Sequence, residues 1–343
     1  MLQPADPGLV ERLGTRRSRE PKGVLPQQAR VLDPLGPLHA DEFAVEVEYL
    51  NIDSASWHQL RLECDGDAGA MAEKIRDIVA QRGKMQNPTT GSGGMLVGRV
   101  SEVGENRSAP RVGERIVSLV SLTLTPLVLD EITTLDPSSE KVRVRGRAIF
   151  FGSSIYASLP ADLPDAAVLG VLDVCGAPAW MARLARPGMS VAVIGAGGKS
   201  GMLTCAQAVR SVGPEGRVLG LCWPEDTVVN AKEAGAEAMA VDCTDALAVG
   251  AAVANALEGN EADLVFVCAN VPGCEGGAIL ACRDEGRVVF FSMATSFTAA
   301  ALTAEGVGKS CEMMIGNGYV PGHADLALDL TRNNPQLLER FSR

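Results

Sequence analysis

The residues with the most specific chemical meaning are the glycines in the stretch SVAVIGAGGKSGMLTCAQAV, residues 190–209. An apolar run leads into these glycines, and a helical pattern follows them directly. A glycine turn between a strand and a helix lets the backbone approach a pyrophosphate, whose charge the helix N-terminus stabilises. The strict Gly-x-Gly-x-x-Gly spacing fails, because Ser200 stands where the third glycine belongs. The stretch therefore predicts a dinucleotide-binding turn of modified spacing, and the alternative is a tight turn without a ligand.

The Gly-Lys-Ser that begins at Gly198 also suggests a triphosphate-binding loop, but that motif requires a glycine where Val193 stands. We therefore expect Lys199 to contact a phosphate of a dinucleotide at the start of a helix. The next apolar run ends at Trp223 and is followed by acidic residues, which favours NAD and leaves NADP open. The predicted cofactor-binding residues are Gly195, Gly197, Gly198, Lys199, Ser200, Gly201, Cys222 and Trp223.

The composition limits the classes of partner. The chain has 343 residues, 46% of them hydrophobic, and a formal net charge of −11. Phosphate surfaces attract basic patches, so this charge argues against nucleic acid and against an anionic membrane. The N-terminal residues lack the apolar segment of a secretory signal, and no uncharged apolar run approaches the ~18 residues that span a bilayer. We expect a cytoplasmic protein with a small-molecule partner, whose nine cysteines are reduced and mostly buried.

The elements that must position these residues change in character along the chain. Up to about residue 160, apolar residues alternate or form short runs broken by Gly and Pro, which is typical of strands. One predicted helix interrupts them over residues 70–83, where Met71, Ile75, Ile78 and Val79 share one face and Gly83 can end the helix. The predicted strands of this part are Phe43–Ile52, Gly94–Gly104, Glu114–Leu122 and Lys141–Phe151.

From Asp165 onward, strands alternate with helical stretches, which predicts parallel βαβ units. The predicted strands are Ser190–Gly195, Arg217–Trp223, Ala262–Asn270, Gly286–Met293 and Met313–Gly318. We therefore predict an α/β protein with a β-rich catalytic (substrate) domain over residues 1–160. A doubly wound parallel-sheet Rossmann domain that binds the dinucleotide is predicted over residues 161–343.

A β-rich domain followed by a Rossmann domain is the order of the medium-chain dehydrogenase/reductase superfamily, which the chain resembles from about Val24 to its end. Three segments carry the resemblance: EFAVEVEYLNIDSASW, GMLVGRVSEVGENRSAPRVGERIVSLV and LPADLPDAAVLGVLDVCGAPAWMARLARPGMSVAVIGAGG. The resemblance implies a GroES-like first domain and a homodimer formed by edge pairing of the Rossmann sheets.

Zinc-dependent members of that superfamily carry their ligands at positions that correspond to about Asp53, Ser92 with Gly93, and Asp173 or Cys175. A catalytic zinc site is built from nitrogen and sulfur ligands, and the central histidine is missing here. The resemblance therefore implies an enzyme that works without a metal and relies on side chains for proton transfer.

A narrower resemblance lies in LNIDSASW, GKMQNPTTGSGGMLVG and IGNGYVPGHADLALDL. These segments are similar to the family of dehydrogenases that act on 3,5-diaminohexanoate. The resemblance implies NAD-linked oxidative deamination of this diamino acid to 5-amino-3-oxohexanoate with release of ammonia, a step of lysine fermentation. Two other functions stay open: a zinc-independent NADPH quinone or enoyl reductase, and a non-catalytic dinucleotide-binding module.

Oxidative deamination needs a base that removes a proton from the substrate ammonium and a group that activates water. Asp53 is predicted as base and ammonium anchor, with a turn or helix cap as the equal alternative. Lys84 is predicted to bind the carboxylate or transfer protons, and the alternative is a solvated loop lysine. Asp173 lies in an apolar stretch and is expected to meet the second ammonium group, since a buried acid there needs a partner. The predicted substrate-binding residues are Ser54, Ser56, Asn87 and Thr90.

The three histidines carry less information. His58 follows the NIDSAS segment and could relay protons, although a surface or structural role is the simpler interpretation. His39 and His323 are interpreted as structural or exposed.

Overall fold

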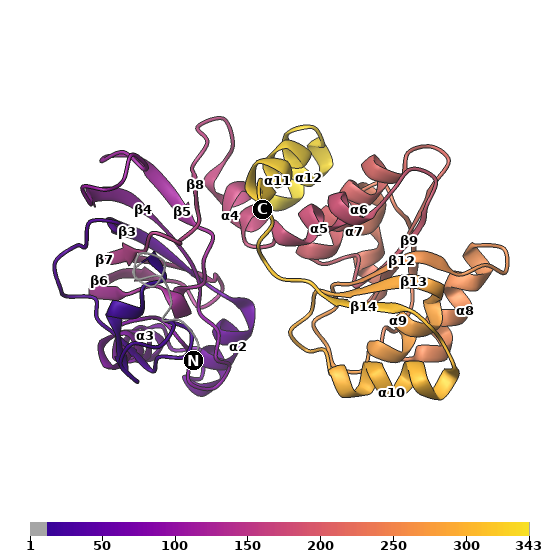
Figure 1. The fold of residues 1–343 in the computed structure, drawn as a ribbon, viewed down its shortest axis with the longest axis horizontal. Helices are drawn as coiled ribbons and strands as arrows, with labels where there is room; N and C mark the ends of the chain where they lie inside the picture. Colours follow the sequence, from indigo (N-terminus) through magenta and orange to yellow (C-terminus); the bar gives the residue numbers. More distant parts are fainter. Residues whose placement is uncertain (1–11, 343) are drawn as a thin grey trace, which may run out of the picture. The chain divides into compact units, whose positions relative to one another are not determined.

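A computed structural model describes residues 12–342, and the chain divides into two compact units after Pro160 (Figure 1). The first unit is built on antiparallel strands, and the second on parallel strands with helices. Each unit has its own buried apolar cluster. The α/β architecture predicted from the sequence is therefore confirmed.

The first unit is centred on an antiparallel sheet with the strand order β6-β7-β3-β4-β5-β8. Its strands are β3 (Phe43–Ile52), β4 (Gly94–Val103), β5 (Arg115–Ser118), β6 (Leu127–Leu135), β7 (Lys141–Phe150) and β8 (Tyr156–Ser158). Strand β3 pairs with β4 on one side and with β7 on the other, so it lies inside the sheet. That position explains why most of β3 is buried, from Phe43 at one end to Ile52 at the other.

Two helices follow β3 in the first unit, α2 (Ser54–Glu63) and α3 (Ala68–Arg82). Helix α3 confirms the helix predicted over residues 70–83. Its N-cap is Asp67, whose carboxylate accepts a hydrogen bond of 2.7 Å from the backbone of Ala70, and Gly83 ends it in the left-handed region at φ 62°. The four apolar residues predicted to share a face are all buried: Met71, Ile75, Ile78 and Val79.

Strand β6 and helix α2 were not among the predicted elements. The apolar pattern of β6 is interrupted by Asp130 and Glu131, yet the strand pairs with β7 along most of its length. The Glu131 carboxylate meets the Arg145 guanidinium across this pair. Pairing with a neighbouring strand, which no local pattern reveals, therefore decides this segment.

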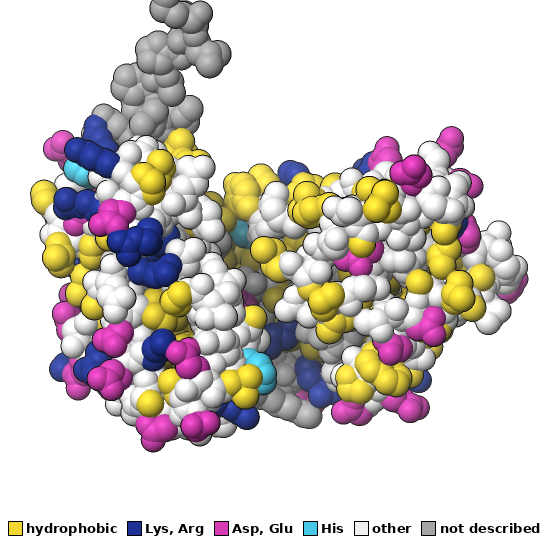
Figure 2. Space-filling model, turned by 90° about the horizontal axis from the view of Figure 1, so that it is seen from below, with side chains coloured by type: hydrophobic (Ala, Val, Ile, Leu, Met, Phe, Trp, Pro, Cys, Tyr) yellow, Lys and Arg dark blue, Asp and Glu magenta, His cyan; other side chains and the backbone are white. Residues whose placement is uncertain are grey.

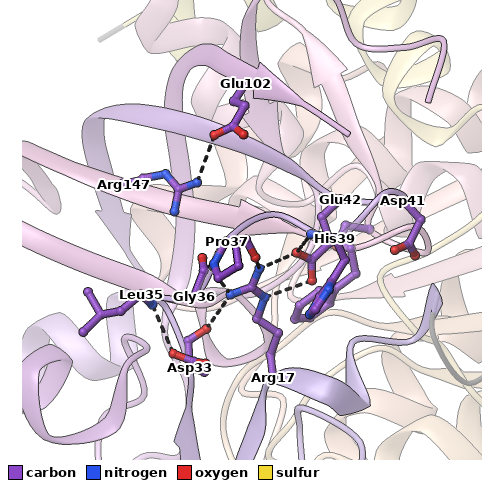
Figure 3. Close-up of polar contacts among 12 residues, drawn as sticks. Arg17, Asp33, Leu35, Gly36, Pro37, His39, Asp41, Glu42, Glu102 and Arg147 are labelled. Atoms are coloured by element: carbon purple, nitrogen blue, oxygen red, sulfur yellow. Dashed lines mark hydrogen bonds and ion pairs between the residues drawn. The ribbon is translucent and has the colours of Figure 1, made fainter. Parts of the chain in front are cut away.

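A buried arginine fastens the N-terminal part of the first unit (Figure 3). Arg17 is the last residue of the short 3-10 helix at Thr15–Arg17 and is 2% exposed. Its Nε donates to Glu42 at 2.9 Å and its Nη2 to the Pro37 carbonyl at 2.6 Å. Longer bonds run from Nη1 to two further carbonyl oxygens, those of Asp33 and Gly36. One guanidinium thus holds the ribbon of β1 (Ser18–Glu20) and β2 (Val31–Leu32) to the segment that enters β3.

The second unit holds a parallel sheet with the strand order β11-β10-β9-β12-β13-β14. Its strands are β9 (Ser190–Ile194), β10 (Arg217–Cys222), β11 (Glu237–Ala240), β12 (Ala262–Val267), β13 (Cys282–Phe290) and β14 (Glu312–Ile315). The five strands predicted from the sequence are present, β13 begins earlier than expected, and β11 was not predicted. Counted along the unit, the order is that of a dinucleotide-binding doubly wound fold.

Helices cover both faces of this parallel sheet, with α5, α6 and α7 on one side of the strands and α8, α9 and α10 on the other (Figure 1). The helices are α4 (Asp165–Leu172), α5 (Gly176–Leu184), α6 (Lys199–Val212), α7 (Val228–Glu233), α8 (Ala246–Ala256), α9 (Glu275–Ala281), α10 (Phe297–Val307), α11 (His323–Arg332) and α12 (Pro335–Ser342). Coverage on both faces explains why β9, β10 and β12 read as continuous apolar runs.

All nine cysteines lie within residues 12–342, and each is a free thiol. Within the same residues no single helix is long and apolar enough to cross a membrane, whereas α4 and α5, bent by 56°, meet that length and composition only as a pair.

Candidate active site

The glycine turn lies at the carboxyl end of β9, where the strand order reverses between β9 and β12. Ligands of doubly wound sheets bind at this reversal. Gly195 has a φ of 80°, and a Cβ at this position would lie 2.5 Å from the backbone nitrogen of Ala269, which follows β12. Both the backbone conformation and the close approach of two strand ends therefore require glycine here.

The modified glycine spacing has a structural reason, because Gly201 takes over the part of the third glycine. A Cβ at Gly201 would lie 2.2 Å from the Gly195 carbonyl oxygen, so helix α6 packs directly on the turn. Gly197 is similarly confined, since a Cβ there would lie 2.6 Å from the Thr227 side chain. Gly198, the N-cap of α6, has no atom nearer than 3.7 Å to an added Cβ. The N-terminus of α6 thus keeps an open approach for an anion.

The remaining predicted cofactor residues differ in accessibility. Lys199 begins α6 and is exposed, and Ser200 beside it is half-buried. Trp223 is 58% exposed at the end of β10. Cys222 is fully buried, and burial raises the pKa of its thiol to about 11. The Cys222 side chain is therefore out of reach of a cofactor, because helices cover both faces of the sheet, and a contact through its backbone stays a prediction.

Asp53 is the N-cap of α2, directly after β3. Its Oδ1 accepts a hydrogen bond of 3.0 Å from the backbone of Ser56, as a cap residue does. Its Oδ2 is buried and has no hydrogen-bond partner among the described residues. A buried carboxylate oxygen without a donor is costly, so Oδ2 calls for a proton donor that the described residues do not supply. The helix-cap interpretation is therefore confirmed for Oδ1, and the role of Asp53 as base and ammonium anchor stays a prediction.

Three hydroxyl groups meet in the first turn of α2 and the loop before β4. Ser56 is fully buried, and its Oγ lies 2.6 Å from Thr90 Oγ1 and 2.8 Å from Ser92 Oγ. Thr90 Oγ1 and Ser92 Oγ are 2.9 Å apart, which closes the triangle. We call these residues the hydroxyl triad. Each hydroxyl can donate once and accept twice, so the hydroxyl triad can bind either an ammonium or a water.

The two other predicted substrate-binding residues have partners within the first unit. Asn87 is 1% exposed, and its amide donates to Gln59 at 2.8 Å while its oxygen accepts from the backbone of Thr89 at 2.8 Å. Asn87 therefore shapes the loop that carries Thr90. Ser54 is exposed, and its hydroxyl donates to the Glu140 carboxylate.

Lys84 lies inside the first unit. Its side chain is fully buried, and Nζ donates to the Pro26 carbonyl oxygen at 3.0 Å. Burial lowers the pKa of this amine to about 8. The alternative of a solvated loop lysine is therefore wrong, because the chain before β4 folds Lys84 under the segment around Pro26.

Asp173 is exposed at the C-terminal end of α4, so the burial considered from its apolar neighbours is wrong. The neighbouring Cys175 is buried, and burial raises its thiol pKa to about 12. His58 is exposed and lines a pocket of the first unit together with Ser54 and Glu140. His323 is 4% exposed, and burial lowers its pKa.

Sequence reasoning missed several polar residues that the fold brings to these sites. Ser92 completes the hydroxyl triad, and Gln59 holds Asn87. In the second unit, the Asn230 amide donates to the Gly197 carbonyl at 2.9 Å, beside Thr227. The available signal was the spacing of Thr227 and Asn230, which places them one turn apart directly after a predicted strand.

The residues around Asp53 do not fit the zinc site of the superfamily. Within residues 12–342, no group of three or more His, Cys, Asp or Glu side chains could hold a metal ion. Asp53 bonds to the backbone of Ser56, and Gly94 lies against its own backbone, whereas zinc is held by imidazole, thiolate or several carboxylates.

An antiparallel unit, a doubly wound parallel unit and a glycine turn at its strand reversal define a two-unit protein with a dinucleotide-binding fold. Solved structures with this fold include the Escherichia coli quinone oxidoreductase complexed with NADPH, at a TM-score of 0.52 and 14% identity over 90% of this chain and 83% of that chain. An alcohol dehydrogenase from Thermus sp. matches at a TM-score of 0.52 and 18% identity, over 91% of this chain and 86% of that chain. At sequence identities this low, the similarity shows only that the folds are alike.

The sequence comparisons identify the family. Residues 16–160 match the family model described as the L-erythro-3,5-diaminohexanoate dehydrogenase N-terminal domain. Proteins named L-erythro-3,5-diaminohexanoate dehydrogenase are 45% identical in Acetoanaerobium sticklandii and 44% identical in Fusobacterium nucleatum, each over 96% of this chain and 97% of the relative. The chain belongs to the L-erythro-3,5-diaminohexanoate dehydrogenase family.

Proposed function

We propose that this protein catalyses the NAD-dependent oxidative deamination of L-erythro-3,5-diaminohexanoate to 5-amino-3-oxohexanoate, with release of ammonia. The observation that carries the proposal is 45% identity over 96% of the chain to a protein named for this activity. In this proposal the first unit holds the substrate, the second unit holds the cofactor, and the reaction serves lysine fermentation.

The proposed reaction begins with loss of a proton from the C3 ammonium, because only the neutral amine can release hydride from C3. Asp53 is the proposed base, and its buried, unpaired Oδ2 supports this role. A bound nicotinamide dinucleotide would supply the acceptor for this hydride. Water then adds to the substrate iminium, and ammonia leaves as the ketone forms. The hydroxyl triad of Ser56, Thr90 and Ser92 is proposed to hold this water, since its oxygens can accept the water's protons.

Other residues are proposed to position these groups. Asn87 fixes the loop that carries Thr90, and Ser54 ties the start of α2 to Glu140. Lys84 is proposed as a positioning residue, because its amine is bonded to Pro26 and its side chain is fully buried. Asp173 is proposed to bind the second ammonium group of the substrate, and its exposed side chain is accessible to such a ligand.

NAD is proposed as the cofactor because acidic residues follow β10. Glu225 and Asp226 are exposed directly beyond Trp223, and no Lys or Arg occurs between Val218 and Ala231. Carboxylates suit the two ribose hydroxyls of NAD and repel the 2′-phosphate of NADP. Catalysis without zinc is proposed as well, on the donor set around Asp53 described above.

A homodimer is proposed through β14, the last strand in the order of its sheet. An unpaired edge strand invites a further strand, and Met313 and Ile315 on β14 are 41% and 63% exposed. Phe297 and Leu302 of α10 add exposed apolar surface, and Figure 2 shows several groups of hydrophobic side chains on the second unit. A cytoplasmic location with no membrane or nucleic-acid partner is proposed from the free thiols and the net charge of −11.

The test is incubation of the purified protein with L-erythro-3,5-diaminohexanoate and NAD. We expect reduced nicotinamide and ammonia to form in equal amounts. Oxidation of NADPH by a conjugated ketone, with no reaction of the diamino acid, would instead identify a quinone or enoyl reductase. Cofactor binding without turnover of either substrate class would identify a non-catalytic module.

A further inference from the structure

A second hollow lies in the first unit, away from Asp53. Its volume is about 540 Å³, and it forms where the segment before β3, the turn at 106–109 and the segment before β8 meet. Its main lining residues are Arg12, Asp41, Asn106, Arg107, Gly152 and Tyr156. We call it the Asp41 pocket. Two guanidinium groups and one carboxylate therefore face one cavity that none of the proposed catalytic residues lines.

The Arg107 guanidinium is locked in place by the main chain. Its Nε donates to the Ala109 carbonyl at 3.0 Å, and its Nη1 donates to the carbonyls of Asp41 at 3.1 Å and Phe151 at 3.2 Å. The guanidinium also lies 4.8 Å from the centre of the Phe43 ring. A cation held by three carbonyls and an aromatic face is preorganised and cannot swing toward a neighbouring side chain.

The Asp41 carboxylate has been left without such a partner. The next residue, Glu42, bonds to the Arg17 guanidinium. The Asp41 carboxylate joins none of the contacts drawn in Figure 3. Its Oδ2 is buried without a hydrogen bond, and the described residues include no ion pair between Asp41 and Arg12 or Arg107. One carboxylate and two guanidinium groups thus line one cavity, and the carboxylate has no ion-pair partner among the described residues.

Space next to this carboxylate is kept by Gly152. A Cβ there would lie 2.7 Å from Asp41 Oδ2 and 3.0 Å from Arg12 Cγ. Its φ is outside the left-handed region, so the backbone does not require glycine, and any larger residue would crowd the acid. Tyr156 closes the pocket on another side, with its ring packed edge-on against Phe43 at 5.3 Å.

The Asp41 pocket is separate from the candidate active site. Asp41 precedes the first residue of β3 and Asp53 follows its last residue, so the two carboxylates stand at opposite ends of one strand. A strand of ten residues spans roughly 30 Å. A molecule of the size of an amino acid cannot reach both carboxylates.

We propose that the Asp41 pocket is a second binding site for a small zwitterionic amino acid. The ammonium group bonds to the Asp41 carboxylate, and the ligand carboxylate pairs with Arg12 and with Arg107, whose guanidinium also meets the Tyr156 hydroxyl. The net positive balance of the pocket, two guanidinium groups against one carboxylate, favours a ligand whose carboxylate is accompanied by only one nearby ammonium. This site is independent of the proposed catalytic reaction.

The experiment is calorimetric titration of the full-length protein with glycine, β-alanine and 5-aminopentanoate, which carry the same two charged groups at increasing separation. Acetate and methylamine, each with one of the groups, are the matched ligands. We expect one zwitterion to bind saturably and both single-charge ligands to bind more weakly. No saturable binding of any zwitterion, or acetate binding as tightly as the best zwitterion, would overturn the proposal.

The variants separate this site from the active site. Asp41→Asn keeps the main-chain carbonyl that Arg107 uses and loses no side-chain bond, so it should fold normally and weaken binding by about 10- to 100-fold. Gly152→Ala should weaken it as well. Asp130→Asn, which removes an exposed carboxylate elsewhere in the first unit, and Asp53→Asn should bind as the native protein does. Binding that survives Asp41→Asn and disappears in Asp53→Asn would place the probe in the active site and refute the second site.

Discussion

Replacing Asp53 by Asn separates the two functions that its two oxygens perform in the structure. Oδ1 accepts the cap bond from Ser56 at 3.0 Å, and an asparagine oxygen accepts the same bond. Asn is as good an N-cap as Asp, so α2 stays intact and the free energy of unfolding changes by less than about 0.5 kcal/mol. The group in place of Oδ2 becomes an amide, which cannot take up a proton.

The expected loss is in kcat. A positioned general base contributes about 10²- to 10⁴-fold, so Asp53→Asn should raise the activation barrier by about 3–5 kcal/mol. The assay follows reduced nicotinamide over a range of diamino acid concentrations, which gives kcat and KM separately, and a thermal unfolding curve checks the fold. The matched control is Asp67→Asn, since Asp67 caps α3 through a 2.7 Å bond to Ala70 and its helix lies outside the hydroxyl triad.

Three results would refute this reasoning. If Asp53→Asn retains full kcat, Asp53 is a helix cap and the base lies elsewhere. If KM rises while kcat is unchanged, Asp53 only anchors the ammonium. A fall in kcat of similar size in Asp67→Asn would trace the loss to helix capping and not to proton transfer.

Four further predictions rest on other parts of the structure. Gly201→Ala should abolish binding of reduced nicotinamide dinucleotide in a fluorescence titration, because the added Cβ would lie 2.2 Å from the Gly195 carbonyl oxygen. The control Gly198→Ala should bind normally, because no atom lies nearer than 3.7 Å to its added Cβ. Arg17→Met should lower the free energy of unfolding in urea by about 3–5 kcal/mol, because Glu42 is left buried and unpaired. The control Arg145→Met breaks an exposed ion pair and should lower it by less than about 1 kcal/mol. Equal losses in the two variants would contradict the prediction. Lys84→Met removes an amine whose pKa is lowered by burial from 10.5 to about 8. Because the unfolded chain binds this proton more tightly, the native protein should gain stability relative to the variant as pH rises from 8 to 10.5. A difference in urea stability between the two proteins that does not change with pH would argue against a buried ammonium. Ile315→Glu should convert a dimer into monomers in light scattering while Leu62→Glu, equally exposed on the first unit, does not; a dimer that survives Ile315→Glu would exclude pairing through β14.

The elements that were predictable from the sequence are those with a strong local pattern. Helix α3 has an apolar face, an Asp cap and a terminal glycine, all of which lie within a few residues of one another. Strands β3 and β9 are apolar enough to stand out without knowledge of their neighbours. Strand β6 is not, because its acidic residues break the apolar pattern and only the pairing with β7, where Arg145 meets Glu131, places this segment in the sheet.

The candidate site shows the same division. Asp53 and the glycine turn were named from their types and positions, and the structure adds which oxygen of Asp53 is free and why Gly201 replaces the expected glycine. Ser92 belongs to the hydroxyl triad only because the loop before β4 folds back on α2. Asp173 illustrates the opposite error, in which apolar neighbours suggested burial for a residue at an exposed helix end.

The sequence by itself determined the α/β architecture, the dinucleotide turn and the dehydrogenase family, because each depends on residue types at short spacing. Only the tertiary structure decided which polar groups are satisfied and which are left without partners. Arg17 and Lys84 look like ordinary basic residues in the sequence, yet one is buried in an ion pair and the other against a carbonyl. Asp41 and Asp53 each keep one buried oxygen unbonded. Hydrogen bonding and desolvation depend on atoms brought together from distant segments, so no local pattern could reveal them.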